Sequence, residues 1–133
     1  MRALLDVNML LALFDLKHLH HAKAKAWWDR EQVSGWASCP ISQNGFLRIV
    51  SQKSYSNPIA LADAIGMLRG WTDRSDHIFL PDDFSVLDRS VIDHTHMLGP
   101  RQITDIYLLA LAVKNNGRLV TLVTGIEIGR AHV

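Results

Sequence analysis

Two carboxylates far apart along the chain stand where metal chemistry is expected. Asp6 follows the short apolar run of residues 3–5, and Asp105 falls in the first turn of a long apolar segment. If both side chains reach one edge of a sheet, their negative charges repel each other, and the pKa of at least one of the two carboxyl groups rises. A Mg²⁺ or Mn²⁺ ion between them removes that cost, because hard cations prefer oxygen ligands. Such an ion beside a phosphodiester polarises the phosphoryl oxygen and activates water, without a Ser, Cys or His nucleophile.

Two amide side chains occupy comparable positions. Asn8 lies two residues after Asp6, and Gln43 is expected in the first turn of another helix, as Asp105 is in its own. Each amide can orient water at the site, although Asn8 fits equally well as a helix cap. Asp105 alone also has a simpler interpretation, because the helix dipole favours a first-turn acid by about 0.3–1 kcal/mol. The metal-site hypothesis therefore depends on Asp6 and Asp105 meeting.

Strands and helices that alternate along the chain must position these side chains. Short strands are expected near residues 2–6, 36–39, 77–80 and 118–123. Helices are expected over residues 9–14, 22–31, 43–52, 57–71 and 102–116, with a short one over 83–92. This alternation predicts an α/β fold with a parallel sheet covered by helices on both faces. Ligand sites in such sheets lie at the carboxyl ends of the strands, which is where Asp6 is expected.

Length and composition fit one ordinary globular domain spanning residues 1–133. Apolar residues make up 48% and charged residues 20%, with a net charge of +1. A nucleic-acid partner would therefore have to meet a local positive surface or a bound metal. Cys39 is the only cysteine, which excludes an internal disulfide and suits a reducing cytoplasm. No run of about eighteen apolar residues or signal peptide is found, so we expect a cytoplasmic protein without a membrane span.

Four segments together resemble the toxins of the VapC family, which carry a PIN domain. They are residues 4–8 (LLDVN), 39–48 (CPISQNGFLR), 101–112 (RQITDIYLLALA) and 117–122 (GRLVTL). The resemblance covers nearly the whole chain. It implies a three-layer PIN-like fold, in which a central parallel sheet of about four strands is flanked by helices.

The same resemblance implies a function. VapC toxins are metal-dependent endoribonucleases of bacterial toxin–antitoxin pairs, usually dimeric and held inactive by a cognate antitoxin. On this basis Asp6 and Asp105 are expected to hold Mg²⁺ or Mn²⁺, which activates water for RNA cleavage. Asn8 and Gln43 are expected to orient water in the catalytic site.

Two positions depart from the family pattern. Gln43 stands where many family members place Glu, and Val123 stands where an Asp usually follows the last strand. With two of four usual acids uncharged, the site is expected to hold one divalent ion weakly, rather than two ions about 4 Å apart. Glu127, Asp82 and Asp83 are other acids, but no sequence pattern brings them to the site. The alternative function is a PIN-fold protein of weakened catalysis that binds RNA or an antitoxin.

Several other side chains have both a functional and a structural interpretation. Arg48 and Arg101 are candidates for contacts with RNA phosphates, or are solvated surface residues. Thr104 is a candidate substrate contact or a helix cap. The histidines at 18, 20 and 21 fit a solvated helix start better than a metal site. The four tryptophans fit a core, a dimer interface or an antitoxin surface better than stacking on RNA bases.

A phosphatase of the haloacid dehalogenase kind is a third possibility, because its nucleophile is an Asp after the first strand. Asp6 fits that role. The chemistry also needs a second acid two residues later, where this chain has Asn8, and a catalytic Lys after a later strand, where this chain has no plausible candidate. Metal-dependent RNA cleavage remains the leading hypothesis.

Overall fold

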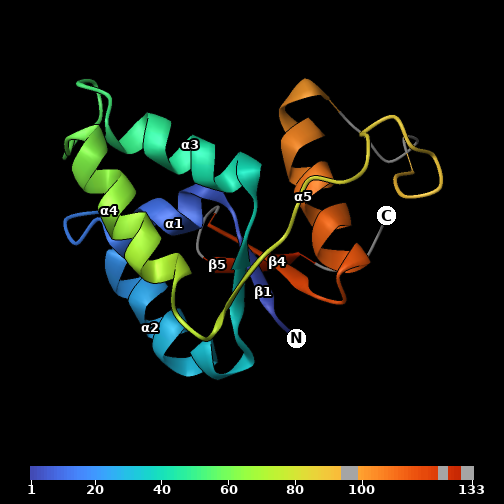
Figure 1. The fold of residues 1–133 in the computed structure, drawn as a ribbon, viewed down its shortest axis with the longest axis horizontal. Coiled ribbons are helices and arrows are strands. Elements are labelled where there is room, and N and C mark those ends of the chain that lie inside the picture. The colour runs from blue at the N-terminus through green and yellow to red at the C-terminus, as the bar shows by residue number, and fades with distance from the viewer. Residues whose placement is uncertain (94–98, 123–125, 130–133) are drawn as a thin grey trace.

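A five-stranded sheet in the order β3-β2-β1-β4-β5 forms the centre of the molecule (Figure 1). The computed structural model describes residues 1–93, 99–122 and 126–129, without the side chains of Arg101 and 126–129. Strands β1 (Ala3–Leu5), β2 (Trp36–Ser38), β3 (His77–Phe79) and β4 (Arg118–Leu122) are parallel, and β5 (Ile126–Gly129) is antiparallel to β4. The four parallel strands confirm the prediction, whereas the sequence did not indicate β5.

Helices cover both faces of the sheet and make three layers (Figure 1). Helices α1 (Val7–Phe14), α2 (His21–Glu31), α3 (Pro40–Val50) and α4 (Leu61–Thr72) lie on one face, and α5 (Ile103–Lys114) covers the other. Short 3₁₀ turns, η1 (Gln32–Ser34) and η3 (Pro100–Gln102), precede β2 and α5. The predicted three-layer α/β fold is confirmed. None of the described helices is long and apolar enough to cross a bilayer.

Alternation along the buried strands divides the core into two parts. Leu5 packs under α1–α4, whereas Leu4 packs under α5, and both are at most 1% exposed. Successive side chains of a strand point to opposite faces, so a short apolar strand supplies both cores. This rule also decides which face receives the polar residues at the strand ends.

The start of α3 differs from the prediction. The helix begins at Pro40, where a proline is favourable because its missing N–H needs no partner. The Ser42 hydroxyl accepts a hydrogen bond from the Cys39 backbone N–H at 3.0 Å and closes the first turn. The helix therefore starts three residues before the predicted start, and Gln43 is its fourth residue.

The short helix predicted over residues 83–92 is wrong, because the structure has consecutive turns there. The Ser85 hydroxyl accepts from the Leu87 backbone N–H, and the Asp88 carboxylate accepts from that of Ser90. Ser and Asp side chains that bond the backbone two residues later stabilise turns and compete with helical hydrogen bonds.

Candidate functional site

Asp6 lies at the carboxyl end of β1, the central strand, and is only 5% exposed. It is also the N-cap residue of α1, and its Oδ1 accepts a hydrogen bond from the Met9 backbone N–H at 2.8 Å. Its Oδ2 accepts a second bond, from the Thr121 hydroxyl. Both carboxylate oxygens are therefore held in fixed positions.

Strand register brings Thr121 to Asp6. Leu5 is paired with Val120, so the next residue of each strand lies side by side at the carboxyl edge. Leu4 and Leu119, two residues earlier on each strand, pack under α5. Alternation therefore places Asp6 and Thr121 on the α5 face of the sheet. Sequence reasoning missed Thr121, because only the pairing of β1 with β4 identifies it.

Asp105 approaches from the first turn of α5, on the same face of the sheet. Its negative charge helps to raise the pKa of Asp6. Burial is the main cause, and the pKa of Asp6 rises to about 6 although the bonds from Thr121 and Met9 lower it. Partial burial also raises the pKa of Asp105, which remains exposed to solvent.

The negative charge at this edge is not compensated within the described parts of the protein. No Lys, Arg or His there forms an ion pair with Asp6 or Asp105. Two interacting carboxylates without a cation fit a single hard divalent ion that keeps most of its water ligands. They do not make a complete protein cage, because the described residues contain no group of three or more His, Cys, Asp or Glu suited to a metal.

The other acids considered from sequence do not complete the site in the described structure. Asp83 is exposed and forms an ion pair with Lys114 at 2.8 Å. Asp82 is partly buried, and burial raises its pKa although the Ile41 backbone at the start of α3 lowers it. Val123 and the side chain of Glu127 lie outside the described residues.

Gln43 is partly buried in the first turn of α3, beside the strand end that carries Ser38. Its Nε2 donates a hydrogen bond to the Ser38 Oγ at 2.9 Å. The same helix crosses the start of α1 closely, since a Cβ built on Gly45 would lie 2.5 Å from the Val7 Cγ2. Because Val7 follows Asp6, this contact brings the beginning of α3 next to the Asp6 turn.

The remaining predicted residues are more peripheral. Asn8 is exposed in the first turn of α1 and is not its cap, because Asp6 is. Thr104 is exposed next to Asp105 and is not a cap either, because Gln102 holds that position in α5.

The two candidate RNA-contacting arginines stand at different places. Arg48 is exposed, about 7.5 Å further along α3 than Gln43 and on another side of the helix. Arg101 belongs to the 3₁₀ turn before α5, but its side chain lies outside the described residues. The predicted contacts of Arg48 and Arg101 with RNA phosphates therefore stay predictions.

The histidine loop and the tryptophans have structural contacts. A ring nitrogen of His21 bonds the Ala12 carbonyl at 2.8 Å, and the His18 ring accepts from the His20 backbone N–H at 3.0 Å. Three of the four tryptophans are buried in the core under α1–α4, namely Trp27, Trp28 and Trp36. These three are unavailable for stacking on RNA bases.

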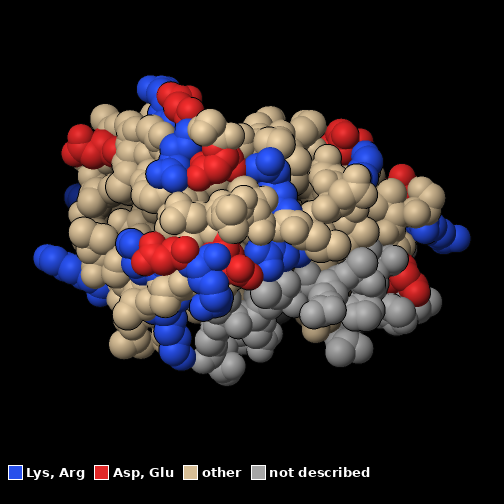
Figure 2. Space-filling view, turned by 90° about the horizontal axis from the view of Figure 1, so that it is seen from below, with Lys and Arg blue, Asp and Glu red and all other residues tan. Residues whose placement is uncertain are grey.

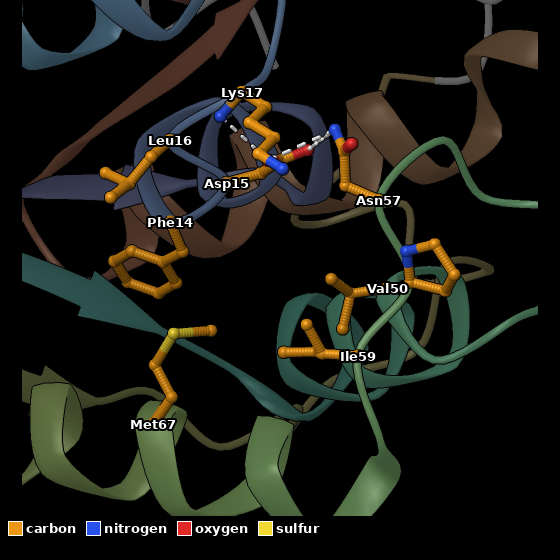
Figure 3. A pocket seen from close by; sticks show the side chains of 9 residues that line it. Phe14, Asp15, Leu16, Lys17, Val50, Asn57, Ile59 and Met67 are labelled. Carbon is orange, nitrogen blue, oxygen red and sulfur yellow. Dashed lines mark hydrogen bonds between the residues drawn. The ribbon is translucent and has the colours of Figure 1, made fainter.

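A pocket of about 350 Å³ lies at the opposite end of α1 from Asp6 (Figure 3). Phe14, Val50, Ile59 and Met67 give it a mainly apolar wall. Asp15 at its rim accepts hydrogen bonds from Asn57 and Tyr55. With its one acid already bonded, this pocket is a poor site for a metal-bound phosphodiester.

The surface seen in Figure 2 carries Lys and Arg side chains mingled with Asp and Glu side chains. No broad field of one sign covers this face, as the net charge of +1 led us to expect. Attraction of RNA to such a face would depend on local contacts more than on long-range steering.

Comparison with known proteins identifies close relatives. The PIN domain family model matches residues 3–123. Ribonuclease VapC44 of Mycobacterium tuberculosis is 51% identical over 121 residues, which cover 91% of this chain and 85% of the relative. Ribonuclease VapC39 of the same species is 41% identical over 122 residues, with coverage of 91% and 88%. The crystal structure of M. tuberculosis VapC20, described as a sarcin-ricin loop cleaving toxin, aligns with a TM-score of 0.63 at 9% identity, covering 86% of this chain and 84% of VapC20.

Proposed function

The chain belongs to the PIN domain family and, within it, to the VapC ribonucleases, and from this premise we propose that it is a toxin-type endoribonuclease. The observation that carries the proposal is the uncompensated pair of Asp6 and Asp105 at the carboxyl edge of the sheet. We further propose a cognate antitoxin as its inhibitor, a homodimer as its assembly and the cytoplasm as its location. Single-stranded RNA loops are the expected substrate class, because unpaired bases expose the edges that proteins read.

Asp6 and Asp105 would hold one Mg²⁺ or Mn²⁺ ion, which supplies positive charge to polarise the phosphodiester and to activate water. Asp6 is prepared for this role because the Met9 N–H and the Thr121 hydroxyl fix its two oxygens. With a pKa of about 6, roughly nine in ten Asp6 side chains are ionised at pH 7. Asp105 is exposed and so can meet the ion from the solvent side.

Gln43 and Asn8 would contribute hydrogen bonds rather than charge. Each amide can hold a water molecule beside the scissile phosphate, and neither changes its protonation state. Thr104, Arg48 and Arg101 remain candidate contacts to the RNA. Phosphate contacts by arginine would position the substrate without reading its sequence.

The proposal is tested by cleavage of short stem–loop RNAs with the purified chain in Mg²⁺ or Mn²⁺. We expect cleavage that stops in excess EDTA and in Asp6→Asn and Asp105→Asn variants that still fold. Ser51→Ala serves as a control, because this hydroxyl bonds the Leu47 carbonyl at the far end of α3 from Gln43. Cleavage that persists in EDTA would refute the metal mechanism.

A second candidate function is a PIN-fold protein that binds RNA or an antitoxin with little cleavage. It is favoured by the uncharged Gln43 and by the lack of a third acid beside the pair within the described residues. It predicts RNA or antitoxin binding with no cleavage in any divalent metal. A binding assay run beside the cleavage assay separates the two functions.

A further inference from the structure

A partly buried chain of hydrogen bonds runs from His77 on β3 through Ser38 to Gln43. Ser38, at the end of β2, is 0% exposed, and its Oγ lies 2.9 Å from the Gln43 Nε2 and 2.7 Å from the His77 Nε2. The backbone of Thr72, the last residue of α4, favours the protonated form of the His77 ring, although burial outweighs this effect and lowers the pKa of His77. The hydrogen-bond chain thus joins three residues on three different elements, Gln43 on α3, Ser38 on β2 and His77 on β3.

The donors in this chain can be assigned. The Gln43 Nε2 donates to the Ser38 Oγ, because the amide nitrogen is the only polar atom of that side chain that donates. The Ser38 hydroxyl can then give its own proton to the His77 Nε2, which lies 2.7 Å away. A neutral imidazole carries one N–H, so with Nε2 as the acceptor this N–H is on Nδ1.

Neighbouring groups hold His77 in place and keep it neutral. Burial is the largest effect on the pKa of His77 and lowers it. The positive charge of Arg2 lowers this pKa further, whereas the negative charges of Asp76 and Asp73 raise it. The Trp36 ring lies 4.5 Å from the His77 ring and donates from Nε1 to Asp76 at 3.2 Å. Arg2 also bonds the Trp36 and Asp76 carbonyls, at 3.2 and 2.7 Å.

We propose that Ser38 and His77 are positioning residues that fix the amide of Gln43, so that its Oε1 and not its Nε2 is presented toward the Asp6 turn. A free glutamine amide has two orientations of nearly equal shape, and only one presents an oxygen. The amide oxygen can coordinate a divalent cation or accept a hydrogen bond from one of its water ligands, whereas the NH₂ group of an amide can do neither. The inference rests on the proposed function for its purpose, but the hydrogen-bond chain can be tested without catalysis.

The first test is nitrogen-15 NMR of the histidine rings in the intact metal-free protein. At pH 7 we expect His77 to be neutral with its proton on Nδ1. In Gln43→Glu the direction of the hydrogen bonds must reverse. The carboxylate of the new glutamate accepts from the Ser38 hydroxyl, and the Ser38 oxygen then accepts from the His77 Nε2–H. Because the Thr72 backbone already favours the protonated ring, His77 should keep the Nδ1 proton, take up a second proton on Nε2 and show a raised pKa. An Nε2–H tautomer in the wild type, or an unchanged His77 titration in Gln43→Glu, overturns the proposal.

The second test measures Mn²⁺ affinity in a double-mutant cycle. Ser38→Ala frees the Gln43 amide and should weaken Mn²⁺ binding about three- to tenfold, the effect of one hydrogen bond. In a Gln43→Glu background the same change should have less than about a twofold effect, because both carboxylate oxygens are acceptors. Ser51→Ala, which removes a hydroxyl at the other end of α3, should match the wild type.

Thermal melts accompany each variant, so that loss of folding is recognised. Equal weakening by Ser38→Ala in both backgrounds would show a merely structural serine and overturn the proposal. If instead the wild type binds Mn²⁺ and shows the expected His77 tautomer but cleaves no RNA, the proposed function fails while the positioning role stands.

Discussion

The hydroxyl of Thr121 should control the ionisation of Asp6. Thr121→Val keeps the shape and β-branching of the side chain but removes the side-chain hydrogen bond that lowers the pKa of Asp6. A hydrogen bond to a charged group contributes about 1.5–3 kcal/mol, and one pKa unit corresponds to 1.36 kcal/mol. The pKa of Asp6 should therefore rise from about 6 by about one to two units, so that half or more of Asp6 is protonated at pH 7.

The pH dependence of stability follows from the direction of this shift. The pKa of Asp6 is raised from 3.8 to about 6, so the folded protein binds the Asp6 proton more tightly than the unfolded chain. The protonated Asp6 stabilises the folded state fully below pH 3.8. As the pH rises to about 6 this contribution is lost, which lowers the free energy of unfolding by about 3 kcal/mol. In Thr121→Val this loss should continue to about pH 7 or 8 and be correspondingly larger.

The assay is urea unfolding of the metal-free protein between pH 4 and 9, with carbon-13 NMR of the Asp6 carboxyl. Asp6→Asn is the matched control, because it removes the titrating group and should flatten this part of the curve. Mn²⁺ affinity at pH 7 should fall in Thr121→Val and recover at pH 9, where Asp6 is ionised again. An Asp6 pKa that stays near 6 in Thr121→Val would refute the reasoning.

Three further changes test other parts of the site. Asp105→Asn should lower the pKa of Asp6 below about 6, because a nearby negative charge is removed, and should weaken Mn²⁺ binding at least about tenfold; the Asp6 NMR titration and a binding isotherm measure both. Gly45→Ala should destabilise the fold by about 1–3 kcal/mol in urea unfolding, since its Cβ would lie 2.5 Å from the Val7 Cγ2; unchanged stability would mean that α3 can move away. Val123→Asp restores an acid where the family usually has one, and it should increase Mn²⁺ affinity and RNA cleavage; no change in either would contradict a site limited by charge.

The amino-acid sequence alone determined the fold class and its three layers. Short apolar runs alternate with helical segments, and that pattern predicts a parallel sheet between two helical layers. It also placed Asp6 at a strand end and Asp105 in a first helical turn, because strand ends and helix starts are marked by local changes in residue type. The segments shared with VapC toxins identified the family, because each segment is a short contiguous run that can be recognised without knowing the tertiary structure.

Only the tertiary structure decided how these positions are connected. Thr121 reaches Asp6 across 115 residues because Leu5 pairs with Val120, and a shift of one residue would turn it to the other face. Gln43 is tied to His77 through Ser38 because β2 lies between β1 and β3, an order that no local pattern specifies. Periodicity records which face of an element is buried, whereas register and strand order depend on the packing of the whole chain.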